Sequence, residues 1–349
     1  MNLLPGPVAI RPDVREALSE MPVSHRSEAF LKTLRNAKEL LCQLTGSRQV
    51  EIMIGSGTLA NDAIAGQLSL TAGRGLILSN GEFGDRLVDH ASRFRLSFDV
   101  LRSDWGDVFD YERVERVIRQ DALVDWLWAV HCETSTGVLN DIGMLKEACA
   151  KRSVRLCLDC ISSIGTVPVD LGSVYLASCV SGKGLGAFPG LSMVFYNHQI
   201  PPAPGALPRY LDLGFYASRD GVPFTHSSNL VSALLRALQR FRSTNRFVET
   251  LDLSMWLKGR LRELGYHVVT PDAHASPAVI TIALPDPLRS GDLGRQLEDA
   301  GYMLSYRSDY LLKRNWIQIC LMAEWSRERL VPLLDKLREI CAPARRSMA

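Results

Sequence analysis

A lysine between glycines is the residue with the clearest chemical potential in this sequence. Lys183 lies in Ser181-Gly182-Lys183-Gly184, directly after an apolar run that is typical of a buried strand. Small neighbours leave the amine uncrowded, and burial together with nearby positive charge would lower its pKa. Such an amine can act as a nucleophile and as a base. A lysine on a surface loop is the alternative, which the apolar flanks disfavour.

An acid occupies a matching position one predicted strand earlier. Asp159 ends the hydrophobic run Leu156-Cys157-Leu158-Asp159. Open α/β sheets bind their ligands at the carboxyl ends of parallel strands, so an acid there faces a potential site. A carboxylate at this point can pair with the cationic nitrogen of a heterocycle. An aspartate that caps a turn or a helix would be the better interpretation if Asp159 stood alone.

A small polar segment offers a place for an anion. Gly55-Ser56-Gly57-Thr58 lies between an apolar run and a predicted helix. Glycines allow close approach of the backbone, hydroxyls can donate, and free N–H groups at a helix start attract negative charge. The same residues also make an ordinary turn with an N-cap, so the segment indicates a phosphate only in combination with other features.

Two more polar segments follow predicted strands. The segment 131–137 adds Glu133 and Thr134 at the same edge of the sheet. The segment 80–86 places Phe83 between small residues, where its ring can lie flat against an aromatic ligand. A polar turn and a ring that anchors its own loop are the alternatives. Each segment is ordinary alone, but five of them at successive strand ends indicate one site.

The five segments, in their order along the chain, resemble the class V aminotransferase family, a group of fold-type-I enzymes that use pyridoxal phosphate (PLP). Within that family the chain is most similar to alanine–glyoxylate (serine–pyruvate) and 2-aminoethylphosphonate–pyruvate transaminases. The resemblance extends over nearly the whole chain. It also covers segments outside the five motifs, at 5–8, 23–30, 210–213, 225–228 and 233–238.

The resemblance implies a role for each matching residue. Lys183 would bind PLP as a Schiff base and later move a proton between the substrate carbon and the cofactor. Asp159 would keep the pyridine nitrogen protonated, and Phe83 would stack on the ring. The remaining cofactor contacts would come from Ser56, Gly57, Thr58 and Ser181 at the phosphate, Thr134 at the ring oxygen, and Thr225 at the phosphate of a neighbouring subunit. The family therefore implies a homodimer with shared active sites.

The segment that would recognise the substrate departs from the family. There an arginine forms a bidentate pair with the substrate's carboxylate or phosphonate, and Gln318 takes its place here. A neutral amide lacks that pair, in which each hydrogen bond to a charged group contributes roughly 1.5–3 kcal/mol. Either the substrate lacks the usual anion or another cation replaces the arginine. The residues expected near the substrate are Gly6, His25, Arg26 and Gln318, and the candidate cations are His25, Arg26, Arg307 and Arg314, although an ordinary salt bridge is the simpler interpretation of each cation.

The predicted function is PLP-dependent, ping-pong transfer of an amino group from an amino acid or amine to a 2-oxo acid or aldehyde. A lyase or decarboxylase of the same fold, acting on a specialised amino substrate, is the alternative. A cysteine desulfurase needs a mobile catalytic cysteine, whereas Cys320 lies in a strand-like run. A scaffold protein without cofactor is disfavoured because Lys183, Asp159 and Phe83 are all present.

These side chains need an α/β scaffold to position them. From residue 35 to residue 196 helical patterns alternate with short apolar runs, which predicts a large domain with a mainly parallel sheet of the seven-stranded type. The pattern after it predicts a smaller C-terminal α+β domain. The expected division is an N-terminal arm at 1–20, a PLP-binding domain at 21–245 and a small domain at 246–349.

The elements expected within this division follow from hydrophobic periodicity. Strands are predicted at 75–78, 98–101, 127–131, 154–159, 177–180 and 192–196 in the large domain, and at 268–270, 279–284 and 315–322 in the small one. Helices are predicted at 27–44, 58–70, 85–94, 111–120, 143–151, 290–300 and 326–340, with a long helical stretch over 229–264 that is interrupted near 243–245.

Composition narrows the class of protein. With 40 basic and 38 acidic residues the net charge is +2, which offers no general attraction to nucleic acid or to an anionic membrane. No apolar run approaches the ~18–20 residues of a membrane span, and the first residues lack a signal-peptide pattern, so a cytoplasmic protein is expected. The eight cysteines include a C-x-x-C at Cys157 and Cys160, but these alternate in a strand pattern and no second pair accompanies them. No metal site is therefore predicted.

Overall fold

The larger sheet holds the strands that carry the candidate site. The computed structural model describes residues 1–242 and 245–346, and within them seven strands form this sheet in the order β1-β9-β8-β7-β4-β2-β3. β9 runs antiparallel to both of its neighbours, and the remaining neighbours pair in parallel. The strands are β1 (Gln49–Ile54), β2 (Arg74–Ser79), β3 (Phe98–Arg102), β4 (Val124–Val130), β7 (Arg155–Asp159), β8 (Leu176–Val180) and β9 (Leu191–Tyr196).

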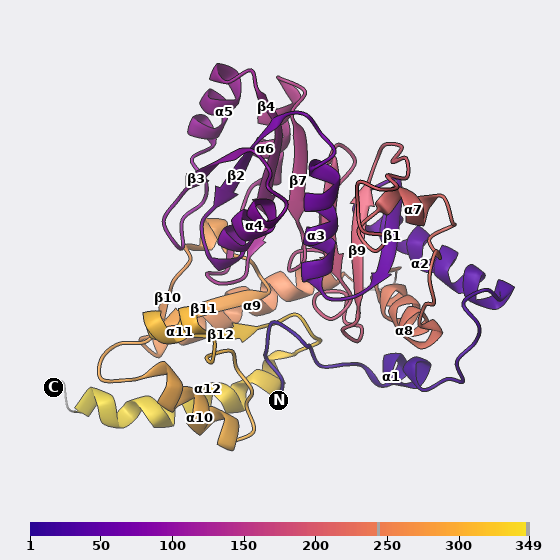
Figure 1. The fold of residues 1–349 in the computed structure, drawn as a ribbon. Coiled ribbons are helices and arrows are strands. Elements are labelled where there is room, and N and C mark those ends of the chain that lie inside the picture. Colours follow the sequence, from indigo (N-terminus) through magenta and orange to yellow (C-terminus); the bar gives the residue numbers. More distant parts are fainter. Residues whose placement is uncertain (243–244, 347–349) are drawn as a thin grey trace.

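Helices cover both faces of this sheet (Figure 1). On one face, α3 (Gly57–Leu68) and α4 (Glu82–Arg93) bury Ile64 and Leu87 in a cluster with Trp128 of β4. Complete burial of such a side chain stabilises the fold by about 1.5–3 kcal/mol. This packing fixes the two helices that line the candidate site.

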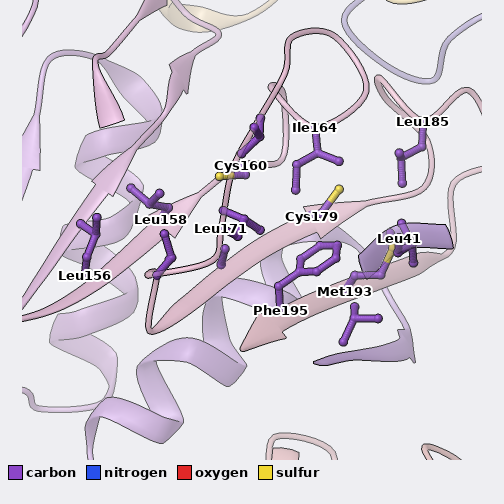
Figure 2. Packing of buried hydrophobic residues seen from close by; sticks show 14 of the residues in the cluster. Leu41, Leu156, Leu158, Cys160, Ile164, Leu171, Cys179, Leu185, Met193 and Phe195 are labelled. Carbon is purple, nitrogen blue, oxygen red and sulfur yellow. The ribbon is translucent and has the colours of Figure 1, made fainter. Parts of the chain in front are cut away.

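The opposite face carries a second apolar cluster. Figure 2 shows part of it, with Leu41 from a helix and Met193 and Phe195 from β9. The helices on this side pack mainly through side chains that recur every three or four residues. They are α1 (Pro12–Leu18), α2 (Glu28–Thr45), α5 (Tyr111–Gln120), α6 (Ile142–Ala150) and α8 (Ser228–Gln239).

α2 shows how local sequence sets one of these helices. The hydroxyl of Ser27 accepts a hydrogen bond from the backbone N–H of Phe30, which caps the first turn. Phe30, Leu34 and Leu41 are buried on one face. Gly46 ends the helix with φ at 67°, a left-handed conformation that glycine adopts without strain. The helix therefore begins and ends within one or two residues of its predicted bounds.

The six strands predicted for the large domain are confirmed, although several of their ends differ. The structure adds to the large sheet one strand that was not predicted: β1, the apolar run Gln49–Ile54 that precedes the glycine segment. It is buried at its four central positions without the alternation of a half-exposed strand. It joins the sheet through β9, a long-range pairing that local sequence does not reveal.

A smaller sheet lies beside the large one (Figure 1). In the described residues it consists of three antiparallel strands, in the order β10-β11-β12. Apolar side chains from the helices around it form a separate core that includes Leu257, Leu297 and Leu333. The elements of this part are α9 (Arg246–Glu263), β10 (His267–Val268), β11 (Val279–Ala283), α10 (Ser290–Asp299), α11 (Asp309–Arg314), β12 (Trp316–Cys320) and α12 (Arg327–Arg346).

The first residues of the chain pack on this smaller sheet. Leu3 is fully buried in its core, and the backbone N–H of Cys320 donates to the carbonyl of Leu3 at 2.9 Å. The long helical stretch divides into α8, a 3₁₀ turn at Arg240–Arg242 and α9. The interruption of this stretch was predicted near residues 243–245, of which Ser243 and Thr244 lie outside the described residues. The domain boundaries at 20/21 and 245/246 stay a prediction.

The polar segments singled out in the sequence follow strands whose ends share one edge of the large sheet. Asp159 ends β7, and Lys183 follows β8. Thr134 and Phe83 follow β4 and β2, while Ser56 follows β1, which runs in the same direction as β8 because both oppose β9. The parallel order of the strands therefore gathers residues from five distant segments.

Some features are absent from residues 1–242 and 245–346. No helix there is both long and apolar enough to cross a membrane. No group of three or more His, Cys, Asp or Glu side chains in that part of the chain is arranged to hold a metal ion. Cys157 and Cys160 are both buried free thiols.

Candidate active site

A cavity of about 290 Å³ lies where these strand ends meet. Its walls come from the start of α3, from α4, from the end of β7, from the loop after β8 and from the N-terminal arm. Asp159, Lys183 and Phe83 all line it, and Gly6 and Pro7 reach it from the arm. Residues that are far apart in the sequence therefore share one concave site.

Lys183 is held in this cavity by a hydrogen bond to a serine. Its Nζ donates to Oγ of Ser162 at 2.9 Å, and that Oγ lies 2.5 Å from Oγ1 of Thr134. Nζ also lies 5.2 Å from the ring centroid of Phe83. Burial lowers the pKa of Lys183, an effect that the charge of Asp159 opposes. A lysine of lowered pKa has a larger uncharged fraction near neutral pH, as a nucleophile or base requires.

Asp159 is the buried acid of the site, with 5% of its surface exposed. Its Oδ2 accepts from Nδ2 of Asn61 at 2.9 Å, and its Oδ1 accepts from the backbone N–H of Ile161 at 2.9 Å. Burial raises the pKa of Asp159, while these two hydrogen bonds and the charge of Lys183 lower it. A carboxylate has about four acceptor positions, so Asp159 retains capacity for a cationic partner.

The start of α3 offers its backbone N–H groups to the cavity. Ser56 is the N-cap residue, and its side chain makes no capping hydrogen bond. Ser56, Gly57 and Thr58 all line the cavity. A Cβ on Gly57 would lie 2.6 Å from Cδ1 of Ile161, so a larger residue there would require the Ile161 side chain to move. An uncapped helix start with positive dipole is a binding site for an anion such as phosphate.

Three residues of α4 face the cavity at helical spacing. Phe83, Arg86 and His90 all line it. Cζ of Arg86 lies 4.8 Å from the ring centroid of Phe83, and Nε of Arg86 is 3.1 Å from Oε1 of Glu82. Nδ1 of His90 lies 2.6 Å from Oδ1 of Asp62. α4 therefore contributes an aromatic ring, a guanidinium and an imidazole to one wall.

Glu133 fixes the first turn of that helix. Its Oε2 accepts from the backbone N–H groups of Phe83 at 3.1 Å and of Gly84 at 3.0 Å, and its Oε1 accepts from the N–H of Ser135 at 3.0 Å. Burial raises the pKa of Glu133, and these hydrogen bonds lower it. The carboxylate caps the helix start, so it holds the Phe83 ring in place without itself lining the cavity.

Some residues predicted for the site lie outside the lining of the cavity. Oγ of Ser181 donates to the carbonyl of Phe188 at 2.6 Å, which shapes the lysine loop. Thr225 is exposed and lies in a separate depression with Ile54. His25 does not line the cavity, and neither does Arg26. The structure therefore does not bring these side chains to the cavity of their own chain.

Two of the candidate cations have other partners. Arg307 pairs with Glu298 at 2.6 Å. The guanidinium of Arg314 lies 3.5 Å from the ring centroid of Trp105. Neither lines the cavity, whereas Arg86 does.

Comparison with known proteins identifies the family. The family model described as aminotransferase class-V matches residues 16–204, more than half of the chain. The chain belongs to the class V aminotransferases. It is a PLP-dependent aminotransferase, and the predicted fold type, cofactor and reaction class are confirmed. No observation favours the lyase or decarboxylase alternative, and Cys320 is 1% exposed in β12.

Individual relatives agree with this assignment. A 2-aminoethylphosphonate–pyruvate transaminase of Pseudomonas fluorescens is 27% identical over 318 residues, which cover 86% of this chain and 86% of that protein. An aspartate aminotransferase of subgroup IV from Thermus thermophilus superposes with a TM-score of 0.86 at 28% identity, over 97% of this chain and 98% of that one. An alanine–glyoxylate aminotransferase from Nostoc sp. gives 0.87 at 26% identity, over 96% and 94%.

The cavity of this aminotransferase fits the cofactor of its family. PLP combines a phosphate, a pyridine nitrogen and an aldehyde on a flat ring. The uncapped start of α3 suits the phosphate, and buried Asp159 suits the nitrogen. The amine of Lys183 suits the aldehyde, and the ring of Phe83 lies beside it. The phosphate, the pyridine nitrogen and the aldehyde of PLP therefore each have a matching group on the wall.

Gln318 links the smaller sheet of the aminotransferase to the large one. Its side chain is fully buried, and Nε2 donates to the carbonyls of Thr134 at 2.6 Å and Ser135 at 3.2 Å and to Oγ1 of Thr281 at 2.9 Å. It does not line the cavity. The amide in the arginine's place thus holds the loop after β4, and the structure does not bring it to the expected substrate position.

Sequence reasoning missed four residues that the fold brings to this site: Asn61, Arg86, His90 and Ser162. For three of them, the spacing along a predicted helix is a signal that could have identified them. Asn61 follows Gly57 by one helical turn, and Arg86 and His90 follow Phe83 at helical intervals. No local pattern marks Ser162, because its contact with Lys183 joins loops after two different strands.

Replacing Gln318 tests its role as the link between the sheets. We expect Gln318→Ala to lower the free energy of unfolding by roughly 2–4 kcal/mol, because the buried carbonyls of Thr134 and Ser135 lose their donor. Urea unfolding measures the change. The control Gln296→Ala removes an exposed amide from α10 and should change stability by less than about 0.5 kcal/mol. Equal stability of the two variants would contradict the link.

Proposed function

We propose that this aminotransferase holds PLP through Lys183 and Asp159 and transfers amino groups in the cavity that they line. The proposal rests on one observation. A lysine of lowered pKa, a buried acid and an uncapped helix start all line the same cavity. PLP, when bound, supplies an electron sink that stabilises negative charge at the substrate carbon. The other tasks belong to groups of the chain.

Lys183 is the group that moves the proton. In one half-reaction its Nζ would take the proton from the substrate carbon and deliver it to the cofactor, and in the other it would move the proton in the opposite direction, as general acid–base chemistry requires. The hydroxyl of Ser162 holds Nζ at 2.9 Å, and Thr134 in turn holds Ser162. Asp159 pairs with the ring nitrogen, while the N–H groups after Ser56 bind the phosphate. The hydroxyl of Ser162 therefore keeps the amine within reach of the reacting atoms.

Reduction of the protein with borohydride in the presence of PLP tests the role of Lys183. We expect peptide mapping to find the cofactor attached to Lys183, because its amine is buried, uncrowded and of lowered pKa. Lys183→Ala should lose both the attachment and the visible absorbance band of the bound cofactor. Lys151→Ala, which removes an exposed lysine paired with Glu115, is the control and should retain both. Attachment of the cofactor elsewhere would contradict the proposal.

We further propose that Arg86 binds the carboxylate of the amino donor. Arg86 lines the cavity and lies against the ring of Phe83. Its own partner, Glu82, belongs to an exposed i, i+4 pair, which costs little to exchange for a substrate anion. The side chain of Gln318 is not available for this role, because it is hydrogen-bonded to the backbone carbonyl of Thr134. Among the described residues, Arg86 is the arginine that lines this cavity, and it can form the bidentate pair that an amide cannot.

Removal of this guanidinium should affect donors selectively. We expect Arg86→Gln to lower kcat/KM for α-amino acid donors about 10- to 100-fold, because a hydrogen-bonded charge pair is lost. Amine donors without a carboxylate should change much less. Arg93→Gln, on the exposed face of the same helix, is the control. An equal loss with both kinds of donor would assign Arg86 to cofactor binding or stability instead.

We propose that the enzyme works as a homodimer in the cytoplasm. Thr225 is exposed and lies outside the cavity of its own chain, as a residue that serves a neighbouring subunit would. Met21, Ile54 and Tyr210 are exposed side chains suited to cover by a second copy. Seven cysteines between Cys42 and Cys320 are free thiols, which fits a reducing compartment.

Mixed dimers test whether Thr225 acts across subunits. Thr225→Glu places a negative charge where the phosphate of the partner would lie, so its homodimer should bind PLP weakly. Refolding it together with Lys183→Ala should create heterodimers in which one site has both residues intact, and activity should return. Ser218→Glu, an exposed change on the same segment, should remain active alone. No recovery on mixing would show that Thr225 acts within its own chain.

A further inference from the structure

Asp159 is held from α3 as well as from its own strand end. Nδ2 of Asn61 donates to its Oδ2 at 2.9 Å, and the backbone N–H of Ile161 donates to its Oδ1 at 2.9 Å. Asn61 is 4% exposed and lines the cavity. An amide that donates to a carboxylate orients it and favours its charged form.

The other end of the same amide has no partner in the described residues. Oδ1 of Asn61 is buried and accepts no hydrogen bond there. Buried acceptors are nearly always satisfied, so an exception beside a ligand cavity needs an explanation. The hydrogen bond to Asp159 explains it. Because Nδ2 of Asn61 must face the carboxylate to donate to it, the orientation of the amide leaves Oδ1 without a donor.

His90 acts on the same acid from α4. It is 7% exposed, lines the cavity, and has its Nδ1 2.6 Å from Oδ1 of Asp62, the residue that follows Asn61 on α3. A carboxylate acceptor makes Nδ1 the protonated ring nitrogen. Burial raises the pKa of Asp159, whereas the hydrogen bond from Asn61 and, to a smaller extent, the proximity of His90 lower it.

We propose that Asn61 and His90 are positioning residues that hold Asp159 ionised and oriented toward the ring nitrogen of the bound cofactor. The inference rests on the proposed role of Asp159. A neutral acid would not keep that nitrogen protonated, because it lacks the charge. Burial alone favours the neutral acid, so the chain needs groups that restore the charge. α3 supplies one by direct contact, and α4 supplies the other through space.

Other groups around Asp159 do not replace these two. Lys183 lowers the pKa of Asp159 in the same way, but only until its amine is used to bind the cofactor. The nearby thiols of Cys132, Cys160 and Cys179 remain neutral, because burial raises their pKa. Asn61 and His90, together with the backbone N–H of Ile161, are therefore the groups that still act on the acid in the loaded enzyme.

The first test replaces the amide with an isosteric apolar side chain. We expect Asn61→Leu to weaken PLP binding about 10- to 100-fold, the equivalent of one hydrogen bond to a charged group. The visible absorbance band of the bound cofactor should move as it does in Asp159→Asn, since both weaken the charge at the ring nitrogen. Gln67→Leu removes a buried amide from the same helix away from the cavity, and it should leave both readouts unchanged.

A double-mutant cycle separates positioning from a purely structural role. If Asn61 acts through Asp159, Asn61→Leu should cause no further loss of PLP affinity in the Asp159→Asn background. The same fold-loss in both backgrounds would overturn the inference, as would unchanged affinity in the wild-type background. Borohydride attachment of PLP to Lys183 is measured in parallel. Its failure in the otherwise wild-type protein would count against the proposed function itself.

His90 gives an independent second measurement, which also applies if Asn61→Leu does not fold. His90→Gln should weaken PLP binding about fivefold, less than Asn61→Leu because its effect is through space. It too should have no effect in the Asp159→Asn background. Asp89→Asn, its exposed neighbour on α4, is the control and should bind PLP as the wild type does. Unchanged affinity in His90→Gln would remove His90 from the proposal.

Discussion

An acid and an amine buried in one cavity are the pair on which the rest of this site depends. Burial shifts the pKa values of Asp159 and Lys183 toward their neutral forms, and the field of each opposes the shift of the other. For the amine, partial neutrality is what nucleophilic and proton-transfer chemistry requires. For the acid, neutrality would remove the charge on which its proposed role depends. The surroundings therefore differ: a serine hydroxyl holds Lys183, whereas two N–H donors hold Asp159.

The architecture supplies these surroundings from a small number of elements. α3 makes two contributions to the cavity. The N–H groups of its uncapped start face it, and Asn61, one turn later, donates a hydrogen bond to Asp159. α4 is fixed by Glu133 from the loop after β4, and it presents Phe83, Arg86 and His90 on one face. Gln318 joins that same loop to the smaller sheet. A chain of hydrogen bonds therefore connects the smaller sheet, through Gln318, Thr134 and Ser162, with Lys183.

Prediction from sequence was accurate for elements with strong local signals. The periodic helices and the buried parallel strands were expected near their observed positions, and the residues at their ends led to Lys183, Asp159 and Phe83. Prediction was less accurate where contacts between segments distant in the sequence determine the position of a strand or a side chain. β1 joins the sheet at its edge through its pairing with β9. Gln318, matched to an arginine by position, is committed to backbone carbonyls of the other sheet.

The sequence by itself determined the candidate residues and the order of the motifs, because strand, turn and helix signals are local and the chemical residues follow them directly. The resemblance of these motifs to the class V aminotransferases implied the family and its cofactor. Only the tertiary structure decided which side chains act together. Asn61 reaches Asp159, Ser162 reaches Lys183, and His90 reaches the cavity because parallel strands bring their ends to one edge and two helices pack over it. The partners of a buried charge are chosen by packing in three dimensions, since its energy depends on every neighbour within a few ångströms and not on neighbours in sequence.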